Sequence, residues 1–219
     1  MLEDAIYNGK YDSEIESYYM KPIGQQDAPE SREAKEITWA SGCTAVSCIV
    51  TPKQVIVANC GDSRAVLCKE EGGEVKEEQL SIDHKPNLPD EKKRIKAAEG
   101  TVESNRVNGF LSTSRSLGIF RFKSNYDIPI DSQLVTGIPE IKVIDRSSTM
   151  KFLILSSDGI WDCVSNQDGV EFLDEGIKLD PKQNLSALLA EMQDELLARE
   201  VDEQGGPGSD NMSAILVQF

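Results

Sequence analysis

Short apolar runs separated by turn residues fill the middle of this chain. Strand-like runs cover residues 44–50, 55–59 and 65–68, with a tight turn at 51–54 and a hairpin tip at 70–74. Short strands joined by tight turns are typical of an antiparallel meander. The pattern therefore predicts antiparallel pairing through this region.

Helical spacing of apolar residues flanks the predicted meander. Residues 1–40 carry an apolar stripe at steps of three and four, and residues 89–99 repeat that pattern before Gly100, which we expect to act as the C-cap. Ser165 and Asp168 form a near capping box, which predicts that a helix starts there.

The second half of the chain alternates between the two periodicities. Strands are predicted at 152–155 and 212–219, and the longest helix is predicted at 184–200. Residues 119–140 contain Pro129 and Pro139 and are predicted to form an irregular surface excursion. Groups of strands that alternate with groups of helices favour an α+β fold, with helices covering antiparallel sheets.

The net charge of −15 over 219 residues narrows the function classes. It argues against nucleic acid as a partner, because phosphates bind Lys and Arg. An acidic protein that acts on phosphate needs metal cations to reverse the local charge. The first ten residues do not resemble a signal peptide, and no apolar run approaches the ~20 residues of a membrane span.

The cysteines indicate a reducing compartment. There are five, without a Cys-x-x-Cys pair, and Cys43, Cys48, Cys60 and Cys68 lie in or beside apolar runs. We therefore expect buried free thiols and a cytoplasmic or nuclear location.

Two carboxylates follow the apolar strand at 152–155. Asp158 and Asp162 are four residues apart, so a helical turn would point them the same way. Like charges at this spacing repel unless a cation lies between them, and Mg²⁺ and Mn²⁺ prefer carboxylate oxygens. The alternative is a plain turn in which Asp158 bonds nearby backbone amides.

Two further strand-edge aspartates strengthen the metal hypothesis. Asp62 lies three residues after the apolar run 55–59, and Asp210 lies just before the last predicted strand. The chain contains a single histidine, His84, which argues strongly against a zinc site built from Cys and His ligands. A carboxylate cage for Mg²⁺ or Mn²⁺ is the more economical explanation.

Seven short motifs also stand in order along the chain. They are Ser41–Val46, Asn59–Arg64, Asp83–Pro86, Arg106–Gly109, Ser114–Gly118, Ser157–Asp162 and Asp210–Ser213. Over about residues 41–219 the chain resembles the metal-dependent Ser/Thr protein phosphatases of the protein phosphatase 2C family.

The resemblance implies an αββα sandwich of two antiparallel sheets flanked by helices. Residues 1–219 would form a catalytic domain of this type that lacks its N-terminal part and first strands, with 119–140 as a flap-like excursion. Its implied activity is hydrolysis of phosphoserine and phosphothreonine in phosphorylated proteins, by water activated on Mg²⁺ or Mn²⁺.

The resemblance also implies roles for individual residues. Asp158 and Asp210 correspond to metal ligands, and Asp62 and Asp162 to carboxylates that hold a further metal or its waters. Residues expected to support the site structurally, through ion pairs or loop contacts, are Arg64, Arg115 and Asn211.

Some expected family features are absent from the sequence. The Asp-Gly-His-Gly segment, with its bridging Asp and general-acid His, does not occur, and neither does the upstream phosphate-binding Arg. No catalytic residue is therefore assigned, and His84 is expected to be structural. Ile119 follows Gly118 where the family has Asp, which weakens the additional metal site.

Two hypotheses follow from these absences. The chain is either part of an active phosphatase or a non-catalytic pseudophosphatase that binds or regulates other proteins. For this chain alone we expect weak metal binding and little or no phosphatase activity.

Overall fold

The computed structural model describes residues 39–198 and 206–219, in two compact units. The sandwich unit contains residues 45–83 and 139–219, and the loop-rich unit contains the described residues up to 44 together with 84–138. Nearly all of the helical stripe predicted at 1–40 lies outside the described residues. No helix in the described part of the chain has the length and apolar character needed to cross a bilayer.

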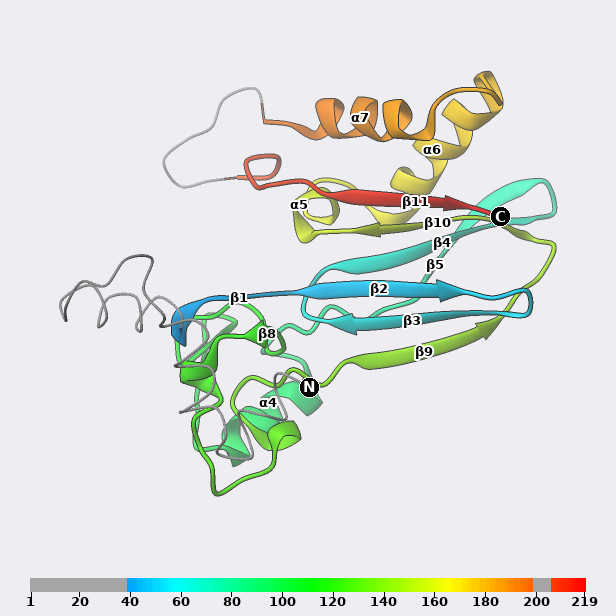
Figure 1. Cartoon of the computed structure of the whole chain (residues 1–219). Coiled ribbons are helices and arrows are strands. Elements are labelled where there is room, and N and C mark those ends of the chain that lie inside the picture. The colour runs from blue at the N-terminus through cyan, green and yellow to red at the C-terminus, as the bar shows by residue number, and fades with distance from the viewer. Residues whose placement is uncertain (1–38, 199–205) are drawn as a thin grey trace, which may run out of the picture. The chain divides into compact units, whose positions relative to one another are not determined.

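The sandwich unit is built from two antiparallel sheets (Figure 1). The four-stranded sheet has the order β11-β10-β4-β5, and the three-stranded sheet has the order β2-β3-β9. The strands are β2 (Ala45–Val50), β3 (Gln54–Cys60), β4 (Arg64–Glu71), β5 (Glu74–Gln79), β9 (Glu140–Asp145), β10 (Met150–Ser156) and β11 (Ala214–Gln218). The predicted strands β2, β3 and β4 are confirmed, but the predicted meander through all three is wrong. β2 pairs with β3 in one sheet, and the chain then crosses to the other sheet, where β4 pairs with β5 and β10.

Apolar side chains fill the space between the two sheets. Val55 and Val57 of β3 pack with Leu67 of β4 and with Leu153 and Leu155 of β10 in one buried cluster. Because successive side chains of a strand point to opposite faces, every second residue of β3 reaches this layer.

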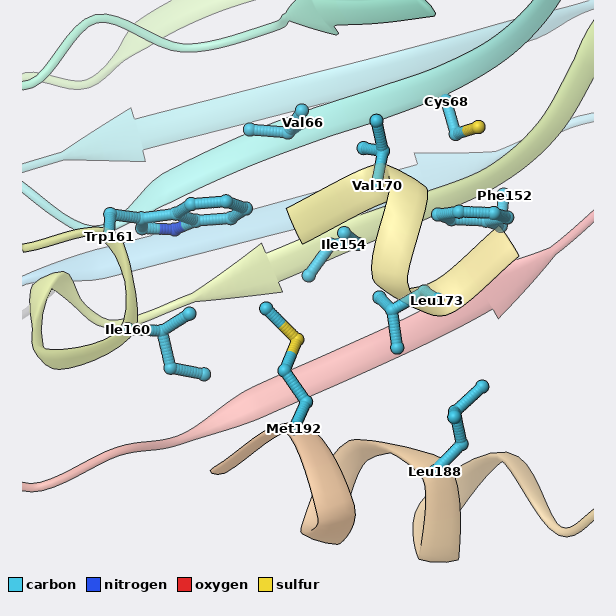
Figure 2. Close-up of a cluster of buried hydrophobic side chains, with 10 residues drawn as sticks. All are labelled: Val66, Cys68, Phe152, Ile154, Ile160, Trp161, Val170, Leu173, Leu188 and Met192. Atoms are coloured by element: carbon cyan, nitrogen blue, oxygen red, sulfur yellow. The ribbon is translucent and has the colours of Figure 1, made fainter. Parts of the chain in front are cut away.

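Helices cover the other face of the four-stranded sheet (Figures 1 and 2). They are α5 (Asp158–Trp161), α6 (Asn166–Leu179) and α7 (Leu185–Leu196). Val170 and Leu173 of α6 and Met192 of α7 pack against Val66 of β4 and Ile154 of β10. β4 and β10 are thus buried on both faces, which explains why their sequences read as continuous apolar runs.

The ends of α6 and α7 follow from their capping residues. Ser165 accepts a hydrogen bond from the Asp168 amide (3.2 Å), as the near capping box predicts. The Asp168 carboxylate accepts from the Ser165 hydroxyl (2.6 Å). Asn184 caps α7 by accepting from the Ser186 amide (3.0 Å). The helix predicted at 184–200 ends earlier, at Leu196.

β9 is a strand that the sequence pattern did not predict. Its residues alternate between inward and outward positions and pair with β3, placing Ile141 opposite Ala58. On the outer face of this sheet, Ile49, Ile141 and Val143 are more than half exposed. The described residues of this unit therefore form three layers (helices, sheet, sheet), and a fourth helical layer is not part of them.

The loop-rich unit contains one longer helix and very short strands. Its elements are β1 (Gly42–Cys43), α4 (Pro89–Ala97), β6 (Val102–Glu103), β7 (Arg106–Val107), β8 (Leu117–Gly118), η1 (Phe120–Phe122) and η2 (Ile130–Ser132). Ile95 of α4 packs in a buried cluster with Ile119, Phe122 and Val135. The segment 119–140 is irregular as predicted, but it supplies core side chains and is not only a surface excursion.

Gly100 has a different role from the predicted C-cap. The left-handed residue after α4 is Glu99 (φ 64°), and Gly100 lies beyond it. A Cβ atom on Gly100 would lie 2.2 Å from Cδ2 of Leu134. The close approach of Leu134 explains why glycine stands at this position.

The cysteines only partly match the prediction. All five are free thiols, and Cys60 and Cys68 are buried, but Cys43 is exposed and Cys48 is half-buried. Cys43 is exposed because β1 has two residues and lies outside the buried clusters. Burial, followed by the nearby Asp174 carboxylate, raises the pKa of Cys68 to about 12, so this thiol stays protonated.

A buried carboxylate connects α4 to the segment 114–115. Glu91 is 3% exposed and accepts hydrogen bonds from Arg94 (2.6 Å), Ser114 (2.6 Å) and both Nε and Nη2 of Arg115 (3.0 and 2.6 Å). Burial alone would raise the pKa of Glu91, but hydrogen bonds from Arg115 and Ser114 and the charge of Arg94 lower it to about 2.

We expect Glu91→Gln to destabilise the protein by about 3 kcal/mol near neutral pH. The ionised carboxylate stabilises the folded state above the ordinary pKa of 4.5, and this contribution disappears as the pH falls from 4.5 towards 2. Urea unfolding across this range should therefore show the two proteins converging in acid. Asp90→Asn, on the exposed first turn of α4, is the control. A difference that does not depend on pH would contradict the role of the charge.

We expect Leu173→Ala to lower the free energy of unfolding by about 3 kcal/mol, because it opens a cavity under α6. Leu173 is fully buried, whereas Leu179 near the end of the same helix is 88% exposed. Leu179→Ala should change the stability by less than about 0.5 kcal/mol. Equal losses in urea unfolding would show that α6 does not pack on the sheet as described.

Candidate metal and phosphate site

The turn after β10 carries the first two aspartates. β10 ends at Ser156, and α5 begins at Asp158. The Asp162 amide donates to the Asp158 carbonyl (2.8 Å), so one helical turn separates these residues. Asp158 is half-buried and Asp162 is exposed. The helical turn predicted after this strand is confirmed, and it brings both carboxylates to one end of the sheet.

The segment that contains Asp210 is attached to this turn. β10 and β11 pair with Ser156 opposite Ala214, so the residues just beyond the pair also meet. Ser157 donates through its amide to the Ser213 carbonyl (3.0 Å) and through Oγ to the Asn211 carbonyl (3.2 Å). Its Oγ also accepts from the Ser213 amide (3.1 Å). Ser157 thus fixes the entry to β11 against the start of α5.

Gly159 allows a close backbone contact at the same place. A Cβ atom on Gly159 would lie 2.5 Å from the Asn211 carbonyl oxygen and 3.5 Å from Cβ of Asp210. Any larger residue would push the two segments apart. The Ser-Asp-Gly motif indicated a tight turn at Gly159. It could not predict the contact with Asn211, which lies about fifty positions further along the chain.

An open hollow of about 450 Å³ lies between these segments. Asp162 and Asp210 line it together with Gly159 and residues 206–209. Asp62, in the turn between β3 and β4, is 5% exposed and is not among the residues that line this hollow. Of the four predicted metal ligands, the structure therefore brings Asp162 and Asp210 to one hollow. Asp158 precedes the lining residue Gly159 in the sequence but is not itself among the residues that line the hollow.

Arg64 supports the start of α6 and the end of α5. Its Nε and Nη2 atoms donate to the Asp83 carboxylate (3.0 and 2.7 Å), and Nη1 donates to Oδ1 of Asn166 (2.7 Å). The guanidinium also lies 5.4 Å from the ring centroid of Trp161. Sequence reasoning identified Arg64 but missed Asp83 and Asn166 as its partners.

The other predicted supporting residues lie in different surroundings. Arg115 pairs with Glu91 and donates to the Ile138 carbonyl (3.1 Å), all within the loop-rich unit. Asn211 contributes its carbonyl to the contacts of Ser157 and Gly159. These contacts exist, whereas support of a metal site by Arg64, Arg115 and Asn211 remains a prediction.

His84 is 1% exposed, and its carbonyl accepts hydrogen bonds from the Ser114 amide and hydroxyl (both 2.8 Å). The Thr113 hydroxyl donates to the same carbonyl (3.2 Å). These bonds are all to the backbone carbonyl, so the structural role expected for the His84 side chain stays a prediction.

The described residues fit only part of a metal site. Carboxylates are suitable ligands for Mg²⁺ or Mn²⁺, which usually take about six oxygen ligands including waters. Within residues 39–198 and 206–219, however, no group of three or more His, Cys, Asp or Glu side chains is placed to hold a metal ion. We therefore derive no reaction step through a metal from this geometry.

We expect Gly159→Ala to lower the free energy of unfolding by about 1–3 kcal/mol, because the new methyl group overlaps the Asn211 carbonyl. Gly206→Ala is the matched control, since a Cβ atom there has no neighbour within 4 Å. Urea unfolding, with near-ultraviolet circular dichroism to follow Trp161, measures both variants. Equal stability of the two variants would show that the contact between α5 and the Asp210 segment is not tight.

Comparisons with known proteins identify a family. The family model "Protein phosphatase 2C" matches residues 8–204. Protein phosphatase 2C homolog 2 of Hypocrea jecorina is 42% identical over 179 residues, which cover 82% of this chain and 39% of the relative. Protein phosphatase 2C homolog 2 of Schizosaccharomyces pombe is 38% identical over 218 residues, which cover 99% of this chain and 56% of the relative.

Solved structures agree with these sequence relatives. A phosphatase from Toxoplasma gondii superposes on this chain with a TM-score of 0.61 at 32% sequence identity. The match covers 76% of this chain and 48% of the Toxoplasma chain. A serine-threonine phosphatase 2C from the same organism has a TM-score of 0.63 at 22% identity, which supports the fold alone. This chain spans about half the length of the curated relatives it matches.

Proposed function

Since the chain belongs to the protein phosphatase 2C family of Ser/Thr phosphatases, we propose that it contributes to hydrolysis of phosphoserine and phosphothreonine in proteins. The observation that carries this proposal is the contact of the Asp158 turn with the Asp210 segment through Ser157 and Gly159. This contact gathers acidic side chains at one end of the four-stranded sheet.

The family is metal-dependent, and for this chain we propose Mg²⁺ or Mn²⁺. Asp158 and Asp210 are the proposed ligands, with Asp62 and Asp162 holding a further metal or its waters. When bound, the metal would supply charge stabilisation at the phosphoryl group and an activated water. The residues of this chain would position the ion, and Ser157 would keep the two ligand-bearing segments together.

We propose that full activity needs a fuller domain than these 219 residues. The chain covers 39% of one curated relative and 56% of another. Its sequence has no Asp-Gly-His-Gly segment, and the described residues give only part of a ligand set. The five free thiols support a reducing location, in the cytoplasm or nucleus.

The alternative is a non-catalytic protein on the same fold that binds or regulates others. The lack of a group of three metal-binding side chains among the described residues favours this alternative. Both hypotheses share the fold, and they differ in whether a divalent ion binds at Asp158 and Asp210.

Calorimetric titration with Mn²⁺ tests the proposed ligands. We expect weak binding to the chain and further loss of at least tenfold in affinity for Asp158→Asn and for Asp210→Asn, because each removes a charged oxygen ligand. Asp194→Asn, which neutralises an exposed residue of α7, should bind like the parent chain. Unchanged affinity in both ligand variants would favour the non-catalytic alternative.

Turnover of a phosphothreonine peptide with Mn²⁺ tests the need for a fuller domain. We expect this chain alone to hydrolyse the peptide far more slowly than an intact relative, such as the Schizosaccharomyces pombe homolog. A rate close to that of the intact relative would show that these residues form a complete catalytic site.

A further inference from the structure

A second hollow lies in the loop-rich unit, within residues that none of the metal-site arguments use. It has a volume of about 250 Å³ and is lined by Asn108, Phe110, Arg121, Phe122 and Leu134. We call it the Phe110 groove. Its residues come from the turn after β7, from η1 and from the segment after η2.

The apolar part of the Phe110 groove suits a single apolar side chain. Phe122 is buried and Leu134 is half-buried, so they form a fixed floor. Phe110 is 71% exposed, which leaves a large aromatic ring in water. Ligand sites are concave, mostly apolar and carry a few placed polar groups, and the hollow under Phe110 has this composition.

The polar part of the groove presents hydrogen-bond donors. The Arg121 guanidinium lies 4.9 Å from the ring centroid of Phe122, and among the described residues Arg121 forms no ion pair. Oδ1 of Asn108 accepts from the Thr101 amide (2.8 Å), which leaves the NH₂ group of Asn108 as a donor. Both groups favour a ligand that brings oxygen acceptors.

The turn that carries Phe110 is fixed before any ligand binds. Asn108 and Gly109 both adopt left-handed backbone conformations, with φ of 51° and 75°. Arg106 donates from Nη1 to the Phe110 carbonyl (2.8 Å), which closes the turn. A preformed site loses less entropy on binding than a mobile one.

We propose that the Phe110 groove binds an acidic peptide segment in which an apolar side chain stands next to carboxylates, as part of a phosphoprotein substrate. The substrate assignment rests on the function proposed above. The apolar side chain would lie on Phe122 and Leu134 under Phe110, and its neighbouring carboxylates would accept from Arg121 and Asn108.

Charge decides between this occupant and others. A chain with a net charge of −15 repels acidic peptides and nucleic acid at long range, so attraction must come from a local cation. Arg121 supplies such a cation, because no carboxylate of residues 39–198 or 206–219 pairs with it. A guanidinium binds carboxylates in a fixed two-pronged geometry. A basic or uncharged peptide would gain nothing from Arg121.

Fluorescence anisotropy on the full chain tests the proposal, with a short fluorescein-labelled peptide in which Glu residues flank one Phe. Two matched peptides replace Glu by Lys or Phe by Ala. We expect the parent peptide to bind with a Kd below about 1 mM and each replacement to weaken binding at least tenfold. No binding of the parent peptide at about 1 mM, or equal binding of the Lys peptide, overturns the proposal.

Variants of exposed residues localise the binding. Arg121→Glu should weaken it about tenfold or more, and Phe110→Ala about fivefold, because they remove the cation and the apolar wall. Lys93→Glu reverses an exposed charge on α4 of the same unit and should change the affinity less than twofold. A loss in Lys93→Glu equal to that in Arg121→Glu would show a general charge effect and overturn the groove as the site.

The proposal can fail separately from the proposed function. Peptide binding is measured with a chelator present, so it does not depend on any metal site, and Mn²⁺ titration of Arg121→Glu does not depend on the peptide. If Asp158→Asn loses Mn²⁺ binding but the parent chain does not bind the peptide, the groove proposal is overturned and the proposed function is not. Peptide binding that requires Arg121 supports the groove even where Mn²⁺ binding is absent.

Discussion

The pairing of β10 with β11 is the constraint on which the candidate site depends. These strands are far apart in the sequence, and their antiparallel register sets Ser156 opposite Ala214. The residues that follow one strand and precede the other must then meet at the same sheet end. Ser157 and Gly159 turn that meeting into close contact with Asn211, and the acidic residues on both segments follow.

Local patterns predicted most of the elements because burial leaves a repeating apolar pattern within each element. β4 and β10 read as continuous apolar runs since helices cover one face and a sheet the other. The start of α6 could be predicted because Ser165 and its capping partner Asp168 are only three positions apart. β9 was missed although its sequence alternates, because Ile141 and Val143 lie on its exposed face and it has no buried apolar run.

The site could be predicted in its chemistry but not in its geometry. Acidic residues after apolar strands are visible in the sequence, and the Asp158 turn formed as expected. The partners of Arg64 at Asp83 and Asn166 were not visible, because folding alone brings these three residues together. The same holds for Glu91, which accepts four hydrogen bonds from residues on two separate segments.

The Ser157 bridge has a consequence for how the protein melts. Because Ser157 bonds to Asn211 and Ser213 at once, the Asp158 turn and the Asp210 segment belong to one cooperative unit with the strand pair. Heating that separates β11 from β10 therefore also separates the Asp158 turn from the Asp210 segment. Amide exchange at Ser157 and Ser213 would then follow the opening of the sheet rather than the fraying of a surface loop.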